Sequence, residues 1–164
     1  MGHGSQHRAA SRKGMTLTEL VVVLVILAVL AAVAIPSFVS ASQQTVNQTV
    51  KQNLRGLALA ENNWYAVHGS FADTAASLAE LDHSFTFVSS TSASTGPSQV
   101  SYALSTATNG YPLLTFAALS TTGTCFTVTQ PPPTSGGSEV TAEYPVSQLP
   151  CDGQEGSTQS GSAW

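Results

Sequence analysis

The chain has 164 residues, a length that suits one domain with a modest core. Nine acidic and five basic residues give a net charge of −4. This acidic balance argues against general nucleic-acid binding, because affinity for phosphates depends on several neutralising Lys and Arg side chains.

The N-terminal region combines a basic leader with a long apolar segment. Arg8, Arg12 and Lys13 precede Gly14, and residues 20–35 are apolar without exception. Glu19 stands at the head of this segment, and no cation follows it before Lys51. A carboxylate in a bilayer costs about 2.5 to 3.5 kcal/mol even on lenient insertion scales, so we expect Glu19 to have a partner.

Cleavage of the chain between Gly14 and Met15 would create that partner. The new α-amino group would lie four residues before Glu19 on one helix face, or beside the Glu19 of a neighbouring copy. At this junction the sequence resembles type IV pilins and the related pseudopilins of type II secretion, which carry a class III signal. Gly14, Met15, Glu19 and Pro36 match the last leader residue, the first and fifth mature residues and the proline near the twenty-second, with Met15 where Phe is commoner.

The resemblance implies a structural subunit of a type IV pilus filament that polymerises through its N-terminal helix. Its partners would be copies of itself, the pilus assembly machinery and a prepilin peptidase that removes residues 1–14. It further implies that Met15 is N-methylated and that Glu19 sets the register of assembly. The precursor would reside in the inner or cytoplasmic membrane, and the assembled subunit in an extracellular pilus on the cell surface. A pseudopilin or minor pilin of a secretion or DNA-uptake machine is the first alternative.

A secreted or anchored binding domain with no assembly role is the second alternative. Ala32, Val33 and Ala34 form a small-x-small site at which a secretory signal could be cleaved, although Glu19 would then have no purpose. The segment could equally be a plain membrane anchor, because the 21 residues from Met15 to Ile35 span about 32 Å as a helix, which is enough to cross a bilayer.

The two cysteines predict a disulfide. The positive leader places the N-terminus of the helix in the cytoplasm, so the chain after Pro36 faces outward. Cys125 and Cys151 then lie in an oxidising compartment, where their pairing would contribute about 3.5 kcal/mol. Free or metal-bound thiols are the alternative. The resemblance also implies a C-terminal disulfide-bounded loop, the D-region.

A helical period continues beyond Pro36, but with apolar residues on one side only. These recur at steps of three or four: Val46, Val50, Leu54, Leu57, Ala58, Trp64 and Tyr65. We expect one helix from about Met15 to about Val67, closed by Gly69 in a left-handed conformation and kinked at Pro36. It divides into an apolar transmembrane and assembly part, residues 15–36, and an amphipathic continuation, residues 37–68.

The remaining residues, 69–164, predict a globular head. A short helix around Ala75 to Leu81 is followed by four strands, separated by turns: Phe85 to Ser89, Val100 to Ser105, Leu113 to Leu119 and Cys125 to Thr129. Short strands and tight turns favour an antiparallel sheet, which gives an α+β fold with the sheet packed on the long helix. From Gln130 we expect a loop held by the disulfide and then a flexible end.

No pattern in the chain indicates catalysis, a cofactor or a metal site. His68 and His83 are isolated, and no serine lies in a nucleophile-elbow context. Calcium could recruit Asp152 and Glu155 with Glu139 or Glu143, but scattered exposed acids are the simpler interpretation. We therefore expect no enzyme activity.

Overall fold

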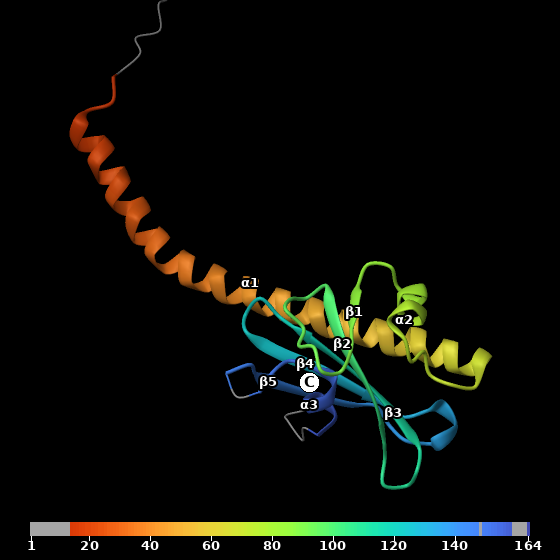
Figure 1. Ribbon diagram of the computed structural model, residues 1–164. Helices are drawn as coiled ribbons and strands as arrows, with labels where there is room; N and C mark the ends of the chain where they lie inside the picture. The colour runs from red at the N-terminus through yellow and green to blue at the C-terminus, as the bar shows by residue number, and fades with distance from the viewer. Residues whose placement is uncertain (1–13, 148, 159–163) are drawn as a thin grey trace, which may run out of the picture. The chain divides into compact units, whose positions relative to one another are not determined.

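The computed structural model describes residues 14–147, 149–158 and 164 (Figure 1). The chain divides into two compact units, the N-terminal unit Met1–Ala41 and the C-terminal unit Ser42–Trp164. Helix α1, Leu17–His68, contributes residues to both.

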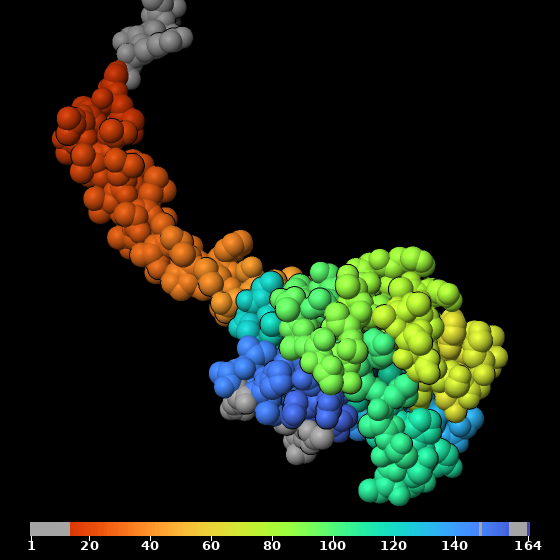
Figure 2. Space-filling view, viewed as in Figure 1, coloured from red at the N-terminus to blue at the C-terminus, as the bar shows by residue number. Residues whose placement is uncertain are grey.

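The described part of the N-terminal unit is helical from Leu17 onward. Its described residues are all exposed, and Figure 2 shows one face of them in the segment coloured red to orange. The helix assignment is unbroken from Leu17 to His68, with Pro36 inside it. The kink at Pro36 stays a prediction.

In the C-terminal unit, α1 buries one stripe of side chains. Val50, Leu54, Leu57, Ala58 and Glu61 are buried, and the first four follow the spacing expected from the sequence. The helix ends as predicted, because Gly69 has a φ of 74° and its N–H donates to the carbonyl of Tyr65 at 2.8 Å. A left-handed glycine satisfies carbonyls that the last turn leaves without a partner.

The sheet has five strands in the order β1-β2-β3-β4-β5. Their bounds are β1 Thr86–Val88, β2 Gln99–Thr106, β3 Pro112–Leu119, β4 Thr124–Gln130 and β5 Val140–Pro145. Strands β2 to β5 pair antiparallel, with Phe116 opposite both Tyr102 and Val128. Strand β1 pairs parallel with β2, which makes the sheet mostly rather than wholly antiparallel. The α2 helix, Ala75–Leu81, matches its predicted bounds.

The main core lies between the sheet and α1, on one face of the strands. Alternate strand residues supply it, including Leu114, Phe116, Phe126 and Val128, and these pack with the buried stripe of α1. This arrangement confirms the α+β fold class, in which a long helix packs on a small sheet.

The opposite face of the sheet is covered by α3, Gly153–Thr158, a helix that was not expected from the sequence. A Cβ atom at Gly153 would lie 2.6 Å from the main-chain nitrogen of Ala103, and one at Gly156 would lie 2.7 Å from a methyl of Thr127. Only glycine therefore permits this close approach of helix to sheet.

The predicted disulfide between Cys125 and Cys151 is present, with a Cα–Cα distance of 5.4 Å. It joins β4 to the segment just before α3, in a small buried cluster with Ala117 and Tyr144. The disulfide therefore fixes the C-terminal segment on the sheet.

The interpretation of everything after Gln130 as loop and flexible end was wrong in three places. Strand β5 extends the sheet, and α3 packs on it. Trp164 is also docked: its Nε1–H donates to the carbonyl of Ala142 at 2.9 Å, and its ring meets Phe126 edge to face at 6.0 Å. Residues 159–163, also expected to be flexible, lie outside the described residues.

Candidate assembly site on the N-terminal helix

The predicted cleavage junction lies in exposed, irregular backbone ahead of α1. Gly14, Met15 and Thr16 precede the first helical residue, Leu17, and Met15 is 60% exposed. Exposed backbone outside regular structure is where proteolysis is easiest. The leader itself, with Arg8, Arg12 and Lys13, lies outside the described residues.

Glu19 takes part in a reciprocal cap at the start of α1. Its main-chain N–H donates to Oγ1 of Thr16 at 3.2 Å, and the N–H of Thr16 donates to Oε2 of Glu19 at 3.4 Å. This is a capping box, in which Thr16 is the cap and Glu19 the third residue of the helix. The carboxylate also lies where the helix dipole favours negative charge.

Because of the capping box, Met15 and Glu19 do not lie on one face of a regular helix, in contrast to the expectation from the sequence. In the uncleaved chain Met15 lies one residue before the cap, outside the regular helix. Cleavage after Gly14 would put the new amine next to the Thr16 amide that the Glu19 carboxylate already binds. Thr16 was missed in the sequence, although Thr-x-x-Glu before an apolar run is the known sequence signal of a capping box.

The surface of α1 that follows Glu19 is apolar on all sides. Large apolar side chains are exposed along it: Leu20, Val21, Val22, Val23, Leu24, Val25, Ile26, Leu27, Val29, Leu30, Val33 and Ile35. By its length and composition, α1 is long and apolar enough to cross a membrane. An uncovered apolar surface of this extent requires lipid or other apolar partners. It fits a membrane-anchored precursor.

The two cationic side chains of α1, Lys51 and Arg55, both contact other residues of the C-terminal unit. Nζ of Lys51 pairs with a carboxylate oxygen of Glu143 at 2.9 Å and lies 5.4 Å from the ring of Trp164. The guanidinium of Arg55 lies 4.7 Å from the same ring and donates to the main-chain oxygen of Trp164 at 2.8 Å. Both side chains therefore hold the molecule together rather than forming a free basic patch.

A second acid on α1, Glu61, is wholly buried. Its Oε1 accepts a 2.6 Å hydrogen bond from the main-chain N–H of Ala72, while its Oε2 has no partner among the described residues. Burial raises the pKa of Glu61 to about 7, and the hydrogen bond from Ala72 opposes that rise. The sequence signal was its position, four residues after Leu57 on the buried stripe.

Two of the acids considered as calcium ligands, Asp152 and Glu143, bind other groups of the chain. Asp152 is nearly buried, and its Oδ1 accepts from the N–H of Glu155 at 2.7 Å, at the start of α3. Glu143 pairs with Lys51. Among the described residues, no group of three or more His, Cys, Asp or Glu side chains is placed to hold a metal ion.

Comparison with known proteins identifies the N-terminal segment. Residues 10–35 match the family model described as the prokaryotic N-terminal methylation motif, and no match to a curated protein or to a solved structure is found. The matched range contains Gly14, Met15, Thr16 and Glu19, and it ends just before Pro36. The motif supports a type IV pilin-like or pseudopilin protein. The chain thus carries the class III signal peptide of type IV pilins, followed by a long apolar helix.

Proposed function

We propose that this chain is a structural subunit, a pilin, of a type IV pilus filament, with no catalytic role. The observation that carries the proposal is the methylation motif at residues 10–35, which extends into the part of α1 whose apolar side chains, from Leu20 to Ile35, are exposed. Such a helix needs apolar surroundings on every side, and a bundle of identical helices provides them.

The same helix would serve two environments in turn. In the membrane its Val, Leu, Ile and Ala side chains contact lipid, and in the filament they contact the corresponding helices of other copies. Both surroundings are apolar, so packing and polar pairing decide between them. Polar pairing comes from Glu19, because its attraction to the Met15 amine of a neighbour is stronger in a bundle of low dielectric than in water.

Processing prepares this pairing. A prepilin peptidase cuts between Gly14 and Met15, and the new amine of Met15 becomes N-methylated. The precursor is held in the inner or cytoplasmic membrane, with the C-terminal unit outside. Assembly machinery then moves the subunit from the membrane into an extracellular pilus.

Substitutions at Glu19 test the assembly role. Glu19→Gln keeps a side-chain oxygen for the capping box but removes the charge, whereas Glu19→Val removes both. We expect both variants to insert into the membrane and to lose most shear-released filaments. Thr18→Val, a polar-to-apolar change at the neighbouring position, is the matched control and should retain filaments. Normal filament yield from Glu19→Gln would refute a role for the charge.

The main alternative keeps the architecture and changes the task to that of a pseudopilin or minor pilin. The methylation motif is compatible with both, and filament composition distinguishes them. Abundant sheared filaments made mainly of this chain support the major pilin, whereas trace amounts in filaments of another subunit support the alternative.

A membrane-anchored or secreted binding domain is the other alternative, and the mass of the mature N-terminus distinguishes it. A chain that starts with N-methylated Met15 supports the pilin group. One that starts at Ile35 indicates a secretory signal, and one that starts at Met1 indicates a plain anchor.

A further inference from the structure

The last residue of β4, Gln130, is a buried amide without a partner. Its side chain is 2% exposed, and neither its Oε1 nor its Nε2 has a hydrogen-bond partner among the described residues. Leaving a buried donor or acceptor unpaired costs about 1 to 3 kcal/mol. A ligand that pairs with both atoms would recover that cost.

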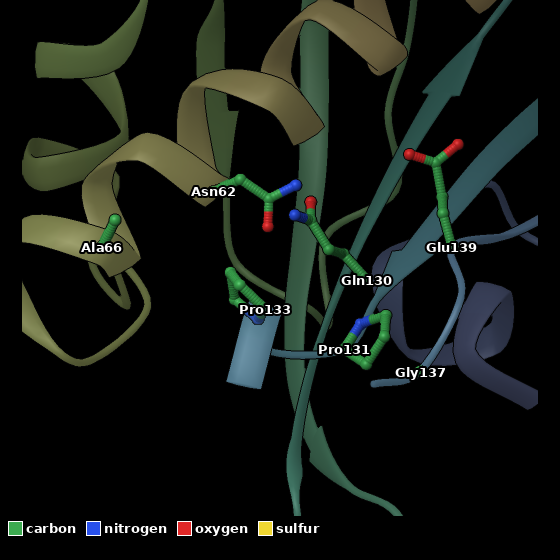
Figure 3. Close-up of a pocket in the computed structure, with 7 residues that line it drawn as sticks. All are labelled: Asn62, Ala66, Gln130, Pro131, Pro133, Gly137 and Glu139. Atoms are coloured by element: carbon green, nitrogen blue, oxygen red, sulfur yellow. The ribbon is translucent and has the colours of Figure 1, made fainter. Parts of the chain in front are cut away.

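Gln130 lines a pocket in the C-terminal unit with a volume of about 270 Å³. Asn62 and Ala66 of α1 form one side, and Pro131, Gly137 and Glu139 contribute from the segment between β4 and β5. In Figure 3 the carboxamides of Gln130 and Asn62 point toward one another, with Glu139 drawn on the other side of Gln130. Three residues with polar side chains therefore line one pocket.

The loop wall of the pocket is fixed by its own contacts. Gly136 has a φ of 67°, and a Cβ atom at Gly137 would lie 2.9 Å from Cγ of Pro131. Ser135 donates through Oγ to the carbonyl of Pro132 at 2.7 Å and accepts from the N–H of Gly137 at 3.1 Å. The wall is thus formed before any ligand arrives, which lowers the entropic cost of binding.

The lining residues define the chemistry of the ligand. A carboxamide offers a donor and an acceptor side by side, so its best partners are groups that both accept and donate, such as neighbouring hydroxyls. The carboxylate of Glu139 accepts only and repels anions, and no Lys or Arg is among the described residues that line the pocket. Pro131 and Pro133 add apolar surface, which suits the C–H groups of a sugar ring.

We propose that this pocket binds a neutral carbohydrate, one sugar ring filling the cavity. Its hydroxyls pair with the carboxamides of Gln130 and Asn62 and donate to Glu139. The inference goes beyond filament assembly and does not depend on it, because every residue involved lies in the C-terminal unit.

The test is a titration of the full-length ¹⁵N-labelled protein in detergent micelles. The probes are glucose, galactose, mannose, N-acetylglucosamine and N-acetylgalactosamine, with N-acetylneuraminic acid as the anionic comparison. At least one neutral sugar should shift the side-chain amide resonances of Gln130 and Asn62 saturably, in the millimolar range. Absence of such shifts across the neutral sugars would overturn the proposal, as would equally tight binding of the anionic sugar.

Paired variants separate binding from folding. Asn62→Ala should weaken binding at least fivefold, whereas Asn63→Ala, at the exposed neighbouring position outside the pocket, should leave it unchanged. Gln130→Leu should abolish binding without loss of stability, because it removes unpaired polar atoms and keeps most of the volume. A markedly less stable Gln130→Leu protein would assign Gln130 a structural role and count against the pocket.

Discussion

Two glutamates on α1 have opposite environments and different tasks. Glu19 is exposed at the start of the helix and binds the Thr16 amide, so the residue at the candidate assembly site is held in place within a single chain. Glu61 is buried near the end of the helix, where its carboxyl receives one hydrogen bond from Ala72. The first is available to a neighbouring copy, whereas the second affects only the chain that contains it.

The burial of Glu61 makes stability depend on pH. Its folded pKa of about 7 lies above the ordinary 4.5, so the protonated form is favoured in the folded state. The stabilisation is complete below about pH 4.5 and is lost as pH rises through about 7. The side chain in Glu61→Gln is neutral at every pH. At pH 8 the free energy of unfolding of this variant should therefore be up to about 3 kcal/mol higher than that of the natural chain.

Denaturant unfolding at about pH 4 and pH 8 checks this prediction. The two proteins should differ little at the lower pH and diverge at the higher one. Glu80→Gln, the same change at an exposed site on α2, is the control. A constant difference between Glu61→Gln and the natural chain across the range would contradict the role of the carboxyl.

At the scale of elements, two glycines should respond to alanine with opposite signs. Gly153 begins α3 against main-chain atoms of Tyr102 and Ala103, so Gly153→Ala should destabilise by about 1 to 3 kcal/mol. Gly56 lies inside α1 with nothing within 4 Å of an added Cβ, so Gly56→Ala should stabilise by about 0.5 to 1 kcal/mol. Thermal unfolding of both variants measures the signs, and a harmless Gly153→Ala would mean that α3 does not pack closely.

The docking of Trp164 ties α1 to the edge strand β5. Its ring makes cation–π contacts with Lys51 and Arg55 of the helix, and its indole N–H donates a hydrogen bond to the carbonyl of Ala142 in the strand. Trp164→Leu should cost about 2 kcal/mol and speed hydrogen exchange of β5 amides, because both the cation–π contacts and the hydrogen bond are lost. Trp164→Phe keeps a ring and should cost about half as much. Unchanged exchange in Trp164→Leu would show that the edge is held by other contacts.

The elements that the sequence predicted share one property, a strong local pattern. The amphipathic period of α1, the apolar strands β2 to β4 and the glycine at position 69 each specify a structure within a few residues. Strand β5 has only Ala142 and Tyr144 buried and ends at a proline, and α3 consists of glycine and polar residues. Both form because the sheet and the disulfide hold them in place, and single-sequence patterns do not contain that information.

The same difference between local and non-local information explains which residues of the candidate sites could be recognised from the sequence. Glu19 was recognised because an acid at the head of an apolar run is costly, and its motif is local. Gln130 carried no such signal, because an amide at the end of a strand is ordinary until the fold buries it. The parallel pairing of β1 was also beyond the sequence, since three residues do not specify the direction of pairing.

At the scale of the whole molecule, the division into two units predicts two separate responses to loss of the disulfide. The bond between Cys125 and Cys151 closes a loop with a sequence separation of 26, which corresponds to about 3.5 kcal/mol on the loop-entropy model. All of this stabilisation belongs to the C-terminal unit. The apolar helix of the N-terminal unit is held by its own hydrogen bonds and by its apolar surroundings, which reduction leaves unchanged.

Paired Cys125→Ala and Cys151→Ala substitutions in the micelle-bound protein test that division. Both tryptophans, Trp64 and Trp164, lie in the C-terminal unit, so their fluorescence reports its unfolding alone. The fluorescence midpoint in urea should fall by an amount that corresponds to about 3 kcal/mol, while amide resonances of residues 20–35 keep their helical shifts at the new midpoint. Loss of both signals at one urea concentration would show that the units unfold together, and that the apolar helix draws its stability from the sheet rather than from its surroundings.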